Sequence, residues 1–377
     1  MSENNVKRVF ISACEPSADL HCGNLIKAVN DEKIEWVGLG GPNMASAGCE
    51  LLENTVDKAA MIYNAFGQIG RYYKLIRRIS AYLKNNKIDL VVVCDSPAFN
   101  FHVAKAAKRA GIKVLFYVAP QLWAWAPWRI RKLRKCCDKL ACILPFEEQW
   151  FRSRGVDATF VGNPLLDDVD YDKTGFRSYK DFDAGKSTIA LMPGSRKAEI
   201  EKLWPAMQQI GKVLKDKLPG MKFIVPILDN KKKQLLKNME VEGLCFEYIS
   251  GGAAKAASNA DFTLVASGSA TLQVASTGCP MVVMYQSSKF FWHFFGKWII
   301  TIPYLSLVNI LASKELVPEF MPYFSSIEPI AQTCCKYLEN KDLLDKTNAE
   351  LIELSKPLAE ENASSKTSKI IKHMLTL

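Results

Sequence analysis

Two short loops of small residues contain groups that could bind a diphosphate. The first, Pro193–Arg196, reads Pro-Gly-Ser-Arg, and the second, Ser267–Thr271, reads Ser-Gly-Ser-Ala-Thr. Glycine lets a backbone approach a ligand closely, N–H groups at a helix start favour an anion, and arginine donates forked hydrogen bonds to phosphate oxygens. Either loop alone could simply cap a helix. Together they predict a diphosphate site formed by Gly194, Ser195, Arg196, Ser267, Gly268, Ser269, Ala270 and Thr271.

The two loops lack the features of a metal-dependent phosphate site. The Gly-Lys-Ser/Thr ending of a P-loop is missing, and no Asp-x-Asp pair follows a predicted strand. We therefore expect no metal and no cofactor, because arginine and helix dipoles would neutralise a departing diphosphate.

Three carboxylates in the first half lie at or near the ends of predicted strands. Glu15 and Asp19 follow the apolar segment Val6–Ala13, and Asp95 directly follows Asp89–Cys94. A carboxylate in such a place could accept the proton of an attacking hydroxyl. It could equally cap a helix or a turn, and the residues leave both possibilities open. The candidate catalytic residues are Asp95, Glu15 and Asp19.

Two segments combine aromatic with basic residues and could lie at a lipid surface. Met61–Tyr73 is apolar and then turns basic, while Phe290–Leu307 is more hydrophobic but contains Lys297 and Pro303, which favours an interfacial segment over a membrane span. Either segment could instead belong to a core. No nucleic-acid module is present, so we expect no nucleic-acid partner. The candidate acceptor and membrane residues are Ser17, Met61, Tyr63, Phe66, Arg77, Arg78, Trp123, Trp125, Arg129, Phe291 and Trp292.

The elements that must position these residues alternate in type along the chain. Short β-branched runs such as Asp89–Cys94 and Phe262–Ala266 are separated by helical patterns such as Gly67–Asn85 and Glu199–Lys217. This alternation is typical of βαβ units in a parallel sheet. We therefore predict an α/β protein with two Rossmann-like, doubly wound domains.

Length and composition support two domains. The 377 residues exceed one ordinary core, and an aspartate-rich, polar stretch lies between the two alternating halves. The predicted division is 1–168 for a first domain, 169–186 for a linker, 187–327 for a second domain that contains both diphosphate loops, and 328–377 for a helical tail. The tail is expected to pack back on the first domain or to be exchanged in a dimer.

Charge and cysteine usage indicate where the protein works. The net charge is +10, and residues 71–139 contain sixteen lysines or arginines against three aspartates. Such a local positive field attracts phosphates and anionic lipids, although it is also compatible with solvated helix faces. The N-terminus shows no secretory signal, and the eleven scattered cysteines indicate thiols in a reducing cytosol.

The ordered motifs resemble the lipid-A-disaccharide synthase family, the inverting glycosyltransferases of bacterial lipid A biosynthesis. The resemblance extends from about Val9 to Pro318. It rests on these segments: Glu15, Ser17 and Asp19; Gly38–Met44 with Gly48; Asp95–Pro97 with Phe99 and Asn100; Tyr117–Trp125; Leu144–Glu147; Phe160–Pro164; Leu191–Arg196 with Glu199; Ala266–Leu272; Pro280–Tyr285; and Ser306–Ala312.

This resemblance implies a GT-B fold, in which two Rossmann-like domains face a cleft. It implies a UDP-linked diacylated glucosamine as donor and a diacylated glucosamine 1-phosphate as acceptor, giving a β-1,6 disaccharide plus UDP without a metal. It places Arg196, the Ser267–Thr271 turn, Gln273 and Asn309 around UDP. It also implies a cytoplasmic protein, peripheral on the inner membrane, and a homodimer.

Three departures from the family pattern bear on this expectation. Asn163 stands where the family usually has histidine, Gln273 replaces a glutamate, and Ala98 replaces a carboxylate associated with catalysis. The alternatives are a diverged glycosyltransferase with another UDP-sugar or acceptor, or a membrane-associated UDP-sugar-binding relative that has lost its activity.

Overall fold

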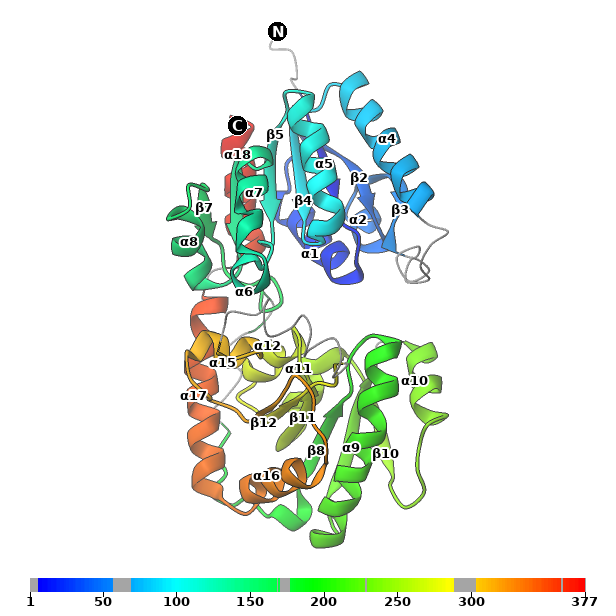
Figure 1. Cartoon of the computed structure of the whole chain (residues 1–377), viewed down its shortest axis with the longest axis vertical. Helices are drawn as coiled ribbons and strands as arrows, with labels where there is room; N and C mark the ends of the chain where they lie inside the picture. Colours follow the sequence, from blue (N-terminus) through cyan, green and yellow to red (C-terminus); the bar gives the residue numbers. More distant parts are fainter. Residues whose placement is uncertain are drawn as a thin grey trace. The chain divides into compact units, whose positions relative to one another are not determined.

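The computed structural model describes residues 6–56, 69–167, 169, 177–227, 229–287, 303–360 and 362–376. The chain forms two compact units, Met1–Asp167 with Leu358–Leu377, and Asp168–Pro357 (Figure 1). The chain therefore crosses from the first unit to the second and returns to the first at its C-terminus. Each unit is a parallel sheet covered by helices, so the prediction of two Rossmann-like α/β domains is confirmed.

The first unit contains a seven-stranded parallel sheet in the order β3-β2-β1-β4-β5-β6-β7. Its order reverses between β1 and β4, which are hydrogen-bonded neighbours. In a sheet of this kind, ligands bind beyond the carboxyl ends of the strands at the reversal. The strands are β1 (Lys7–Ser12), β2 (Ile34–Gly40), β3 (Glu50–Asn54), β4 (Leu90–Cys94), β5 (Lys113–Tyr117), β6 (Lys139–Cys142) and β7 (Ala158–Phe160).

Helices cover both faces of this sheet because its central strands are apolar on both sides. In β1, Val9 and Ile11 pack with buried side chains of α1 and α18, whereas Phe10 between them contacts Tyr82 of α4. The helices are α1 (Pro16–Val29), α2 (Pro42–Ser46), α4 (Ile69–Asn85), α5 (Pro97–Arg109), α6 (Leu122–Trp125), α7 (Ile130–Cys136), α8 (Pro145–Arg152) and α18 (Ala363–Met374), with a 3₁₀ turn at Pro127–Arg129.

The second unit contains a six-stranded parallel sheet in the order β10-β9-β8-β11-β12-β13. Its reversal point lies between β8 and β11, which again pair directly. The strands are β8 (Thr188–Met192), β9 (Lys222–Ile227), β10 (Phe246–Ser250), β11 (Phe262–Ala266), β12 (Met281–Met284) and β13 (Glu319–Phe320).

A large apolar core on one face of this second sheet is built around Trp204, which is fully buried. Trp204 donates its indole N–H to the carbonyl of Leu236 at 3.1 Å, which fixes α10 against α9. The helices are α9 (Lys197–Lys217), α10 (Asn230–Lys237), α11 (Gly252–Ser258), α12 (Ala270–Ala275), α15 (Leu307–Ala312), α16 (Glu328–Leu338) and α17 (Lys341–Ala359), with a 3₁₀ turn at Ala184–Lys186.

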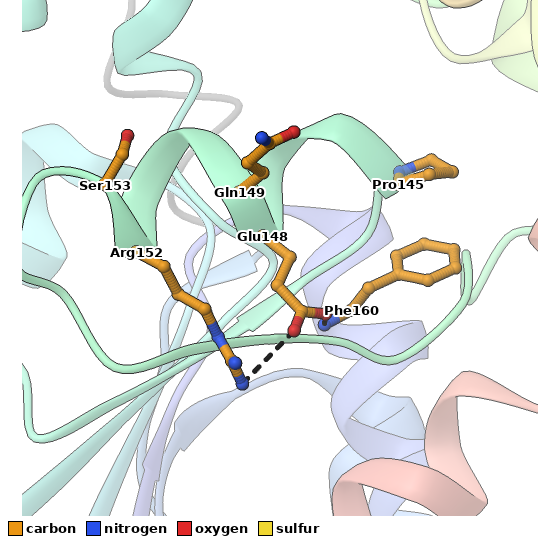
Figure 2. Close-up of a pocket in the computed structure, with 6 residues that line it drawn as sticks. All are labelled: Pro145, Glu148, Gln149, Arg152, Ser153 and Phe160. Carbon is orange, nitrogen blue, oxygen red and sulfur yellow. Dashed lines mark hydrogen bonds and ion pairs between the residues drawn. The ribbon is translucent and has the colours of Figure 1, made fainter.

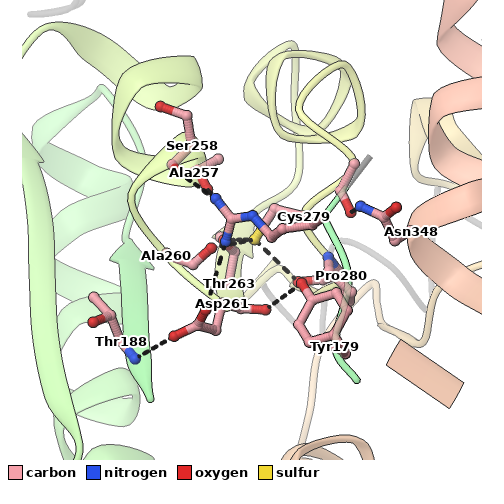
Figure 3. A network of polar contacts seen from close by, with 12 residues as sticks. Tyr179, Thr188, Ala257, Ser258, Ala260, Asp261, Thr263, Cys279, Pro280 and Asn348 are labelled. Atoms are coloured by element: carbon pink, nitrogen blue, oxygen red, sulfur yellow. Dashed lines mark hydrogen bonds and ion pairs between the residues drawn. The ribbon is translucent and has the colours of Figure 1, made fainter. Parts of the chain in front are cut away.

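A polar network fixes the chain where it enters the second unit (Figure 3). Arg177 donates to the carbonyls of Ala257 and Ser258, and Tyr179 donates its hydroxyl to the carbonyl of Asp261 at 2.8 Å. The Asp261 carboxylate accepts the N–H of Thr188 at 2.8 Å. Because Thr188 and Asp261 stand at the amino ends of β8 and β11, this network is at the sheet edge opposite to the ligand-binding edge.

The predicted tail 328–377 is divided between the units. α16 lies in the second unit and α17 almost entirely so, while α18 packs on α1 of the first. The Asp167 carboxylate fixes the start of α18 by accepting hydrogen bonds from the N–H groups of Ala363 and Ser364 and from the Ser364 hydroxyl, at 2.7, 3.1 and 2.6 Å. No helix within the described ranges combines the length and the apolar composition that a membrane span requires.

Candidate active site

Glu15 and Asp95 lie together at the reversal point of the first sheet. Glu15 follows β1 and Asp95 follows β4, and these strands are neighbours in parallel register. The Ser96 hydroxyl donates to Glu15 Oε1 at 3.4 Å, which joins the two strand ends. The structure therefore brings two of the three candidate catalytic carboxylates to one place.

The turn after β4 has an unusual backbone. Asp95 and Ser96 both have positive φ, at 50° and 41°, although neither is glycine. The N–H of Asp95 donates to the carbonyl of Tyr117 at 3.1 Å, and Pro97 begins α5 directly afterwards. Non-glycine residues held in such a conformation are frequent at functional sites, so the geometry supports the choice of this turn.

Asp19 has a structural role. Its buried carboxylate accepts hydrogen bonds from the N–H groups of Gly41, Asn43 and Met44 and from the Asn43 side chain, at 2.7 to 3.2 Å. These contacts fasten α1 to the turn that leads into α2. These contacts give Asp19 a structural role, and its assignment as a catalytic base stays a prediction.

Trp123 also differs from its prediction as a lipid contact. Its ring is buried against Phe146, and its indole N–H donates to Glu147 Oε1 at 2.9 Å. Glu147 also accepts the N–H groups of Ile143 and Leu144 at 3.1 Å, and burial raises its pKa to about 7. Trp123 is thus a core residue, because its single N–H is satisfied inside the protein. Glu147 belongs to the Leu144–Glu147 motif, but the sequence by itself predicted no role for its side chain.

Several other predicted lipid contacts lie on the surface of the first unit. Trp125 is 37% exposed, and the Arg129 guanidinium lies over its ring at 5.0 Å from the centroid. Arg77 and Arg78 are exposed on α4, where Arg78 pairs with Glu53 at 3.1 Å. Ser17 is exposed in the first turn of α1. The remaining predicted members of this set, Met61, Tyr63, Phe66, Phe291 and Trp292, lie outside the described residues.

In the second unit, the loop after β8 contains the predicted glycine and arginine. Gly194 has φ of 105°, and a Cβ there would meet Glu199 Oε2 at 2.6 Å, so the position requires glycine. The Glu199 carboxylate accepts the N–H groups of Ser195 and Arg196 at 3.2 Å and the Arg196 guanidinium at 3.1 Å. The predicted anion-binding groups of Ser195 and Arg196 thus donate hydrogen bonds to a carboxylate of the helix that follows them. The sequence alone did not predict this contact.

The loop after β11 lies beside the first, because β11 pairs with β8. Gly268 and Ser269 are exposed, Ser267 and Ala270 are half-buried, and no atom lies within 4 Å of a Cβ built at Gly268. Thr271 is buried and donates both its hydroxyl and its N–H to the carbonyl of Gly268, at 2.8 and 3.1 Å. Thr271 therefore shapes the turn. Gln273 is half-buried in the following helix.

Asn309 is occupied within the fold. Its buried amide donates to the Val317 carbonyl and to Glu319 Oε2, and it accepts the N–H groups of Leu316 and Val317, at 2.8 to 3.0 Å. Glu319 additionally accepts the N–H groups of Leu305 and Ser306. Because every polar group of the Asn309 amide is used in these contacts, the side chain has a structural role in fixing α15 beside β13. Its placement around UDP stays a prediction.

Comparisons with known proteins decide the family. The sequence matches the model of the family described as lipid-A-disaccharide synthetase over residues 9–374. A lipid-A-disaccharide synthase of Geobacter metallireducens is 32% identical over 375 residues, covering 98% of this chain and 97% of the relative. A lipid-A-disaccharide synthase 1 of Legionella pneumophila (strain Lens) is 33% identical over 372 residues, covering 95% of each chain. The chain belongs to the lipid-A-disaccharide synthase family. The resemblance stated from the motifs is confirmed, and the protein is a glycosyltransferase.

Solved structures show the same fold at low sequence identity. A co-structure of S. aureus MnaA with UDP has a TM-score of 0.66 at 15% identity and covers 98% of this chain and 97% of that one. The crystal structure of Acinetobacter baumannii MurG has a TM-score of 0.59 at 16% identity and covers 97% and 99%. The prediction of a GT-B type fold is therefore confirmed.

Ala98 stands where the resemblance of the motifs led us to expect a carboxylate. Ala98 is exposed in the first turn of α5, and its carbonyl accepts the Tyr72 hydroxyl at 2.9 Å. The side chain supplies no proton acceptor there. Glu15 and Asp95 are the neighbouring carboxylates at this reversal point in the present chain.

Neither the hollow along α8 nor any acidic, cysteine or histidine cluster of the described residues forms a second candidate site. A shallow hollow of about 420 Å³ lies along α8, where Glu148 pairs with Arg152 at 3.2 Å and accepts the N–H of Phe160 at 2.7 Å (Figure 2). Its polar groups stabilise α8 and β7, and it contains none of the predicted site residues. Among the described residues, no cluster of three or more histidine, cysteine or acidic side chains could hold a metal.

Proposed function

We propose that this protein transfers a diacylated glucosamine from its UDP donor to diacylated glucosamine 1-phosphate, giving a β-1,6-linked disaccharide 1-phosphate and UDP. The observation that carries the proposal is the match to one family along residues 9–374, together with relatives of that name that cover nearly the whole chain. The placement of both sets of candidate residues at sheet reversal points supports it, since these are the positions where such folds bind ligands.

We assign donor binding to the second unit, which contains the proposed donor domain, residues 187–327. Gly194, Ser195 and Arg196 lie at the end of β8, and Ser267–Thr271 lie beside them at the end of β11. An arginine and helix-start N–H groups can neutralise the charge that develops on a leaving diphosphate, so no metal is required. Solved structures of the same fold that contain UDP or UDP-GlcNAc support a uridine nucleotide.

In the first unit, Glu15 or Asp95 would act as the base. The acceptor hydroxyl attacks the anomeric carbon of the donor, a carboxylate takes the hydroxyl proton, and the bond from the anomeric carbon to the diphosphate oxygen breaks with release of UDP. Attack on the face opposite the leaving group inverts the anomeric configuration. Two adjacent carboxylates at one strand reversal suit this role, in a chain where Ala98 provides none.

The acyl chains of both substrates require a lipid surface, and we assign its contact to the first unit. α4, α5 and α7 lie side by side and contain much of the positive charge between Arg71 and Lys139. Trp125 and Arg77 are exposed in this part of the chain, and Arg129 is half-buried. Aromatic rings and cations are suited to the headgroup region of an anionic membrane. We accordingly propose a peripheral location on the cytoplasmic face of the inner membrane, and a homodimer.

Ala98 favours one competing function, a UDP-sugar-binding protein without transferase activity. The decisive experiment incubates the purified protein with both acylated substrates in detergent and follows release of UDP and the mass of the product. Disaccharide formation that disappears in Glu15→Ala or Asp95→Ala, with UDP affinity retained, is the expected result. UDP binding without product would favour the non-catalytic function, and product from another UDP-sugar in a donor panel would favour a diverged transferase.

A further inference from the structure

The left-handed turn at Asp95 and Ser96 must be held by its surroundings. Ser96 has φ 41° and ψ 59°, which brings the Cβ of an L-residue close to its own backbone and is therefore unfavourable. Two consecutive residues with Cβ atoms adopt positive φ at this point. Such a conformation persists only where other contacts determine it.

Asn100 supplies these contacts from the first turns of α5. Its side chain is fully buried, and its Nδ2 donates to the carbonyl oxygens of Cys94 and Asp95, both at 2.8 Å. An amide nitrogen has two protons, so both are used on the peptide groups that lead into the left-handed turn. The backbone N–H of Asn100 also donates to the carbonyl of Ser96 at 3.0 Å.

Ser12 in turn fixes the orientation of the Asn100 amide. The buried Ser12 hydroxyl donates to Asn100 Oδ1 at 2.8 Å. Ser12 is the last residue of β1, and Glu15 follows three residues later. One side-chain amide therefore links the end of β1 to the turn after β4, and Ser96 closes the link by donating to Glu15 at 3.4 Å.

We propose that Asn100 is a positioning residue for the transfer reaction. Its amide, oriented by Ser12, holds the turn left-handed and so places Asp95 and Glu15 where one of them can accept the acceptor's proton. This inference rests on the proposed function. The role requires two donors and one acceptor on a short side chain, a combination that aspartate and alanine lack.

The test replaces Asn100 by aspartate, which has nearly the same shape but loses both donors. We expect kcat to fall by about 10²-fold, because small displacements of catalytic groups have effects of this size. The KM for the donor and the affinity for UDP should stay close to wild type, since the donor loops belong to the second unit. The acid limb of the kcat–pH profile should shift, because the surroundings of the base change.

Asn348→Asp is the matched control. Asn348 is also a buried amide that donates to a backbone carbonyl, that of Gly278 at 2.7 Å, but it belongs to α17. This variant should lose stability while keeping kcat per folded molecule. Ser96→Gly alone removes the hydrogen bond to Glu15, so this single variant measures the cost of that loss. Added to Asn100→Asp, Ser96→Gly should restore part of kcat, because glycine adopts a left-handed backbone without steric cost.

The possible outcomes separate the two proposals. Wild-type kcat in Asn100→Asp, or a loss that Asn348→Asp reproduces per folded molecule, would overturn the positioning role alone. A wild-type protein that binds UDP but forms no disaccharide would overturn the proposed function and this inference with it. A selective loss of kcat with partial rescue by Ser96→Gly supports the inference.

Discussion

At the scale of single residues, Arg196 and Glu199 make the main polar contacts of the proposed donor loop. The guanidinium is exposed and pairs with the Glu199 carboxylate at 3.1 Å, while that carboxylate also accepts the N–H groups of Ser195 and Arg196. A phosphate oxygen arriving here would meet the same donors. The loop is therefore already shaped around a negatively charged oxygen.

We predict that Arg196→Ala weakens UDP binding by roughly 1.5–3 kcal/mol, the range for hydrogen bonds to charged groups. The reason is loss of a charged, forked donor to the diphosphate. Isothermal titration calorimetry with UDP measures the effect, and Lys197→Ala is the control because Lys197 is exposed in the same helix turn and pairs with Glu201. Unchanged affinity in Arg196→Ala would remove this residue from the donor site.

The residue types in the sequence predicted where the candidate residues lie better than they predicted what those residues do. Glu15, Asp95 and Arg196 were identified because strand ends and a glycine turn are visible locally. The structural roles of Asp19 and Asn309 were not predicted, because their partners at Gly41–Met44 and Leu316–Glu319 are separated from them in sequence. Whether a polar group is free or satisfied depends on neighbours that only folding brings together.

At the scale of elements, Glu147 joins α6 to the start of α8. It accepts the Trp123 indole and two N–H groups of the Ile143–Leu144 segment, and it is completely buried. Removal from water disfavours the carboxylate more than these donors stabilise it, so its pKa rises from 4.5 to about 7. The stability of the contact between α6 and the start of α8 therefore depends on whether Glu147 is protonated.

The pH dependence of stability follows from this shift. Between pH 4.5 and about 7 the folded chain retains a proton that the unfolded chain has released, so the free energy of unfolding falls as pH rises through this window. Over the whole window, the proton retained on Glu147 changes the free energy of unfolding by about 3 kcal/mol. Urea unfolding at several pH values measures how the free energy of unfolding depends on pH. In Glu147→Gln this free energy should no longer fall between pH 4.5 and about 7 on account of residue 147, whereas in Glu148→Gln, a change at the half-buried neighbour, the fall should remain. An unaltered slope in Glu147→Gln would contradict the shifted pKa.

Docking of α18 is the second prediction at this scale. Asp167→Ala removes three hydrogen bonds at the start of α18 and should lower stability by about 1–2 kcal/mol, as loss of a strong helix cap does. Hydrogen exchange should accelerate within α18 first. Asp181→Ala, at an exposed position, serves as control and should leave α18 protected. Equal protection of α18 in both variants would argue against the cap.

At the scale of the whole molecule, the last residues of the chain complete the first unit. Ile371 of α18 is fully buried in the core that includes Val9 and Leu25, whereas Ile330 of α16 is fully buried in the core of the second unit. Each unit thus has its own apolar core.

We predict that Ile371→Ala and Ile330→Ala each lower stability by about 2–4 kcal/mol, but in different units. Amide exchange measured by mass spectrometry should increase mainly in β1 and α1 for Ile371→Ala, and mainly in β8 and α9 for Ile330→Ala. Saturating UDP should counteract only the Ile330→Ala effect, because ligand binding stabilises the unit that holds it. Protection of both units by UDP in Ile371→Ala would show that the units do not unfold separately.

The sequence by itself determined the two α/β domains, the family and the loops at the strand ends. Periodicity and glycine turns act over a few residues, so they are readable in one dimension. The tertiary structure decided the order of the strands, the return of α18 to the first unit, and the partners of buried polar groups. It also revealed the Ser12–Asn100 link, because residues 88 positions apart in the chain become neighbours only when β1 and β4 pair at the reversal point.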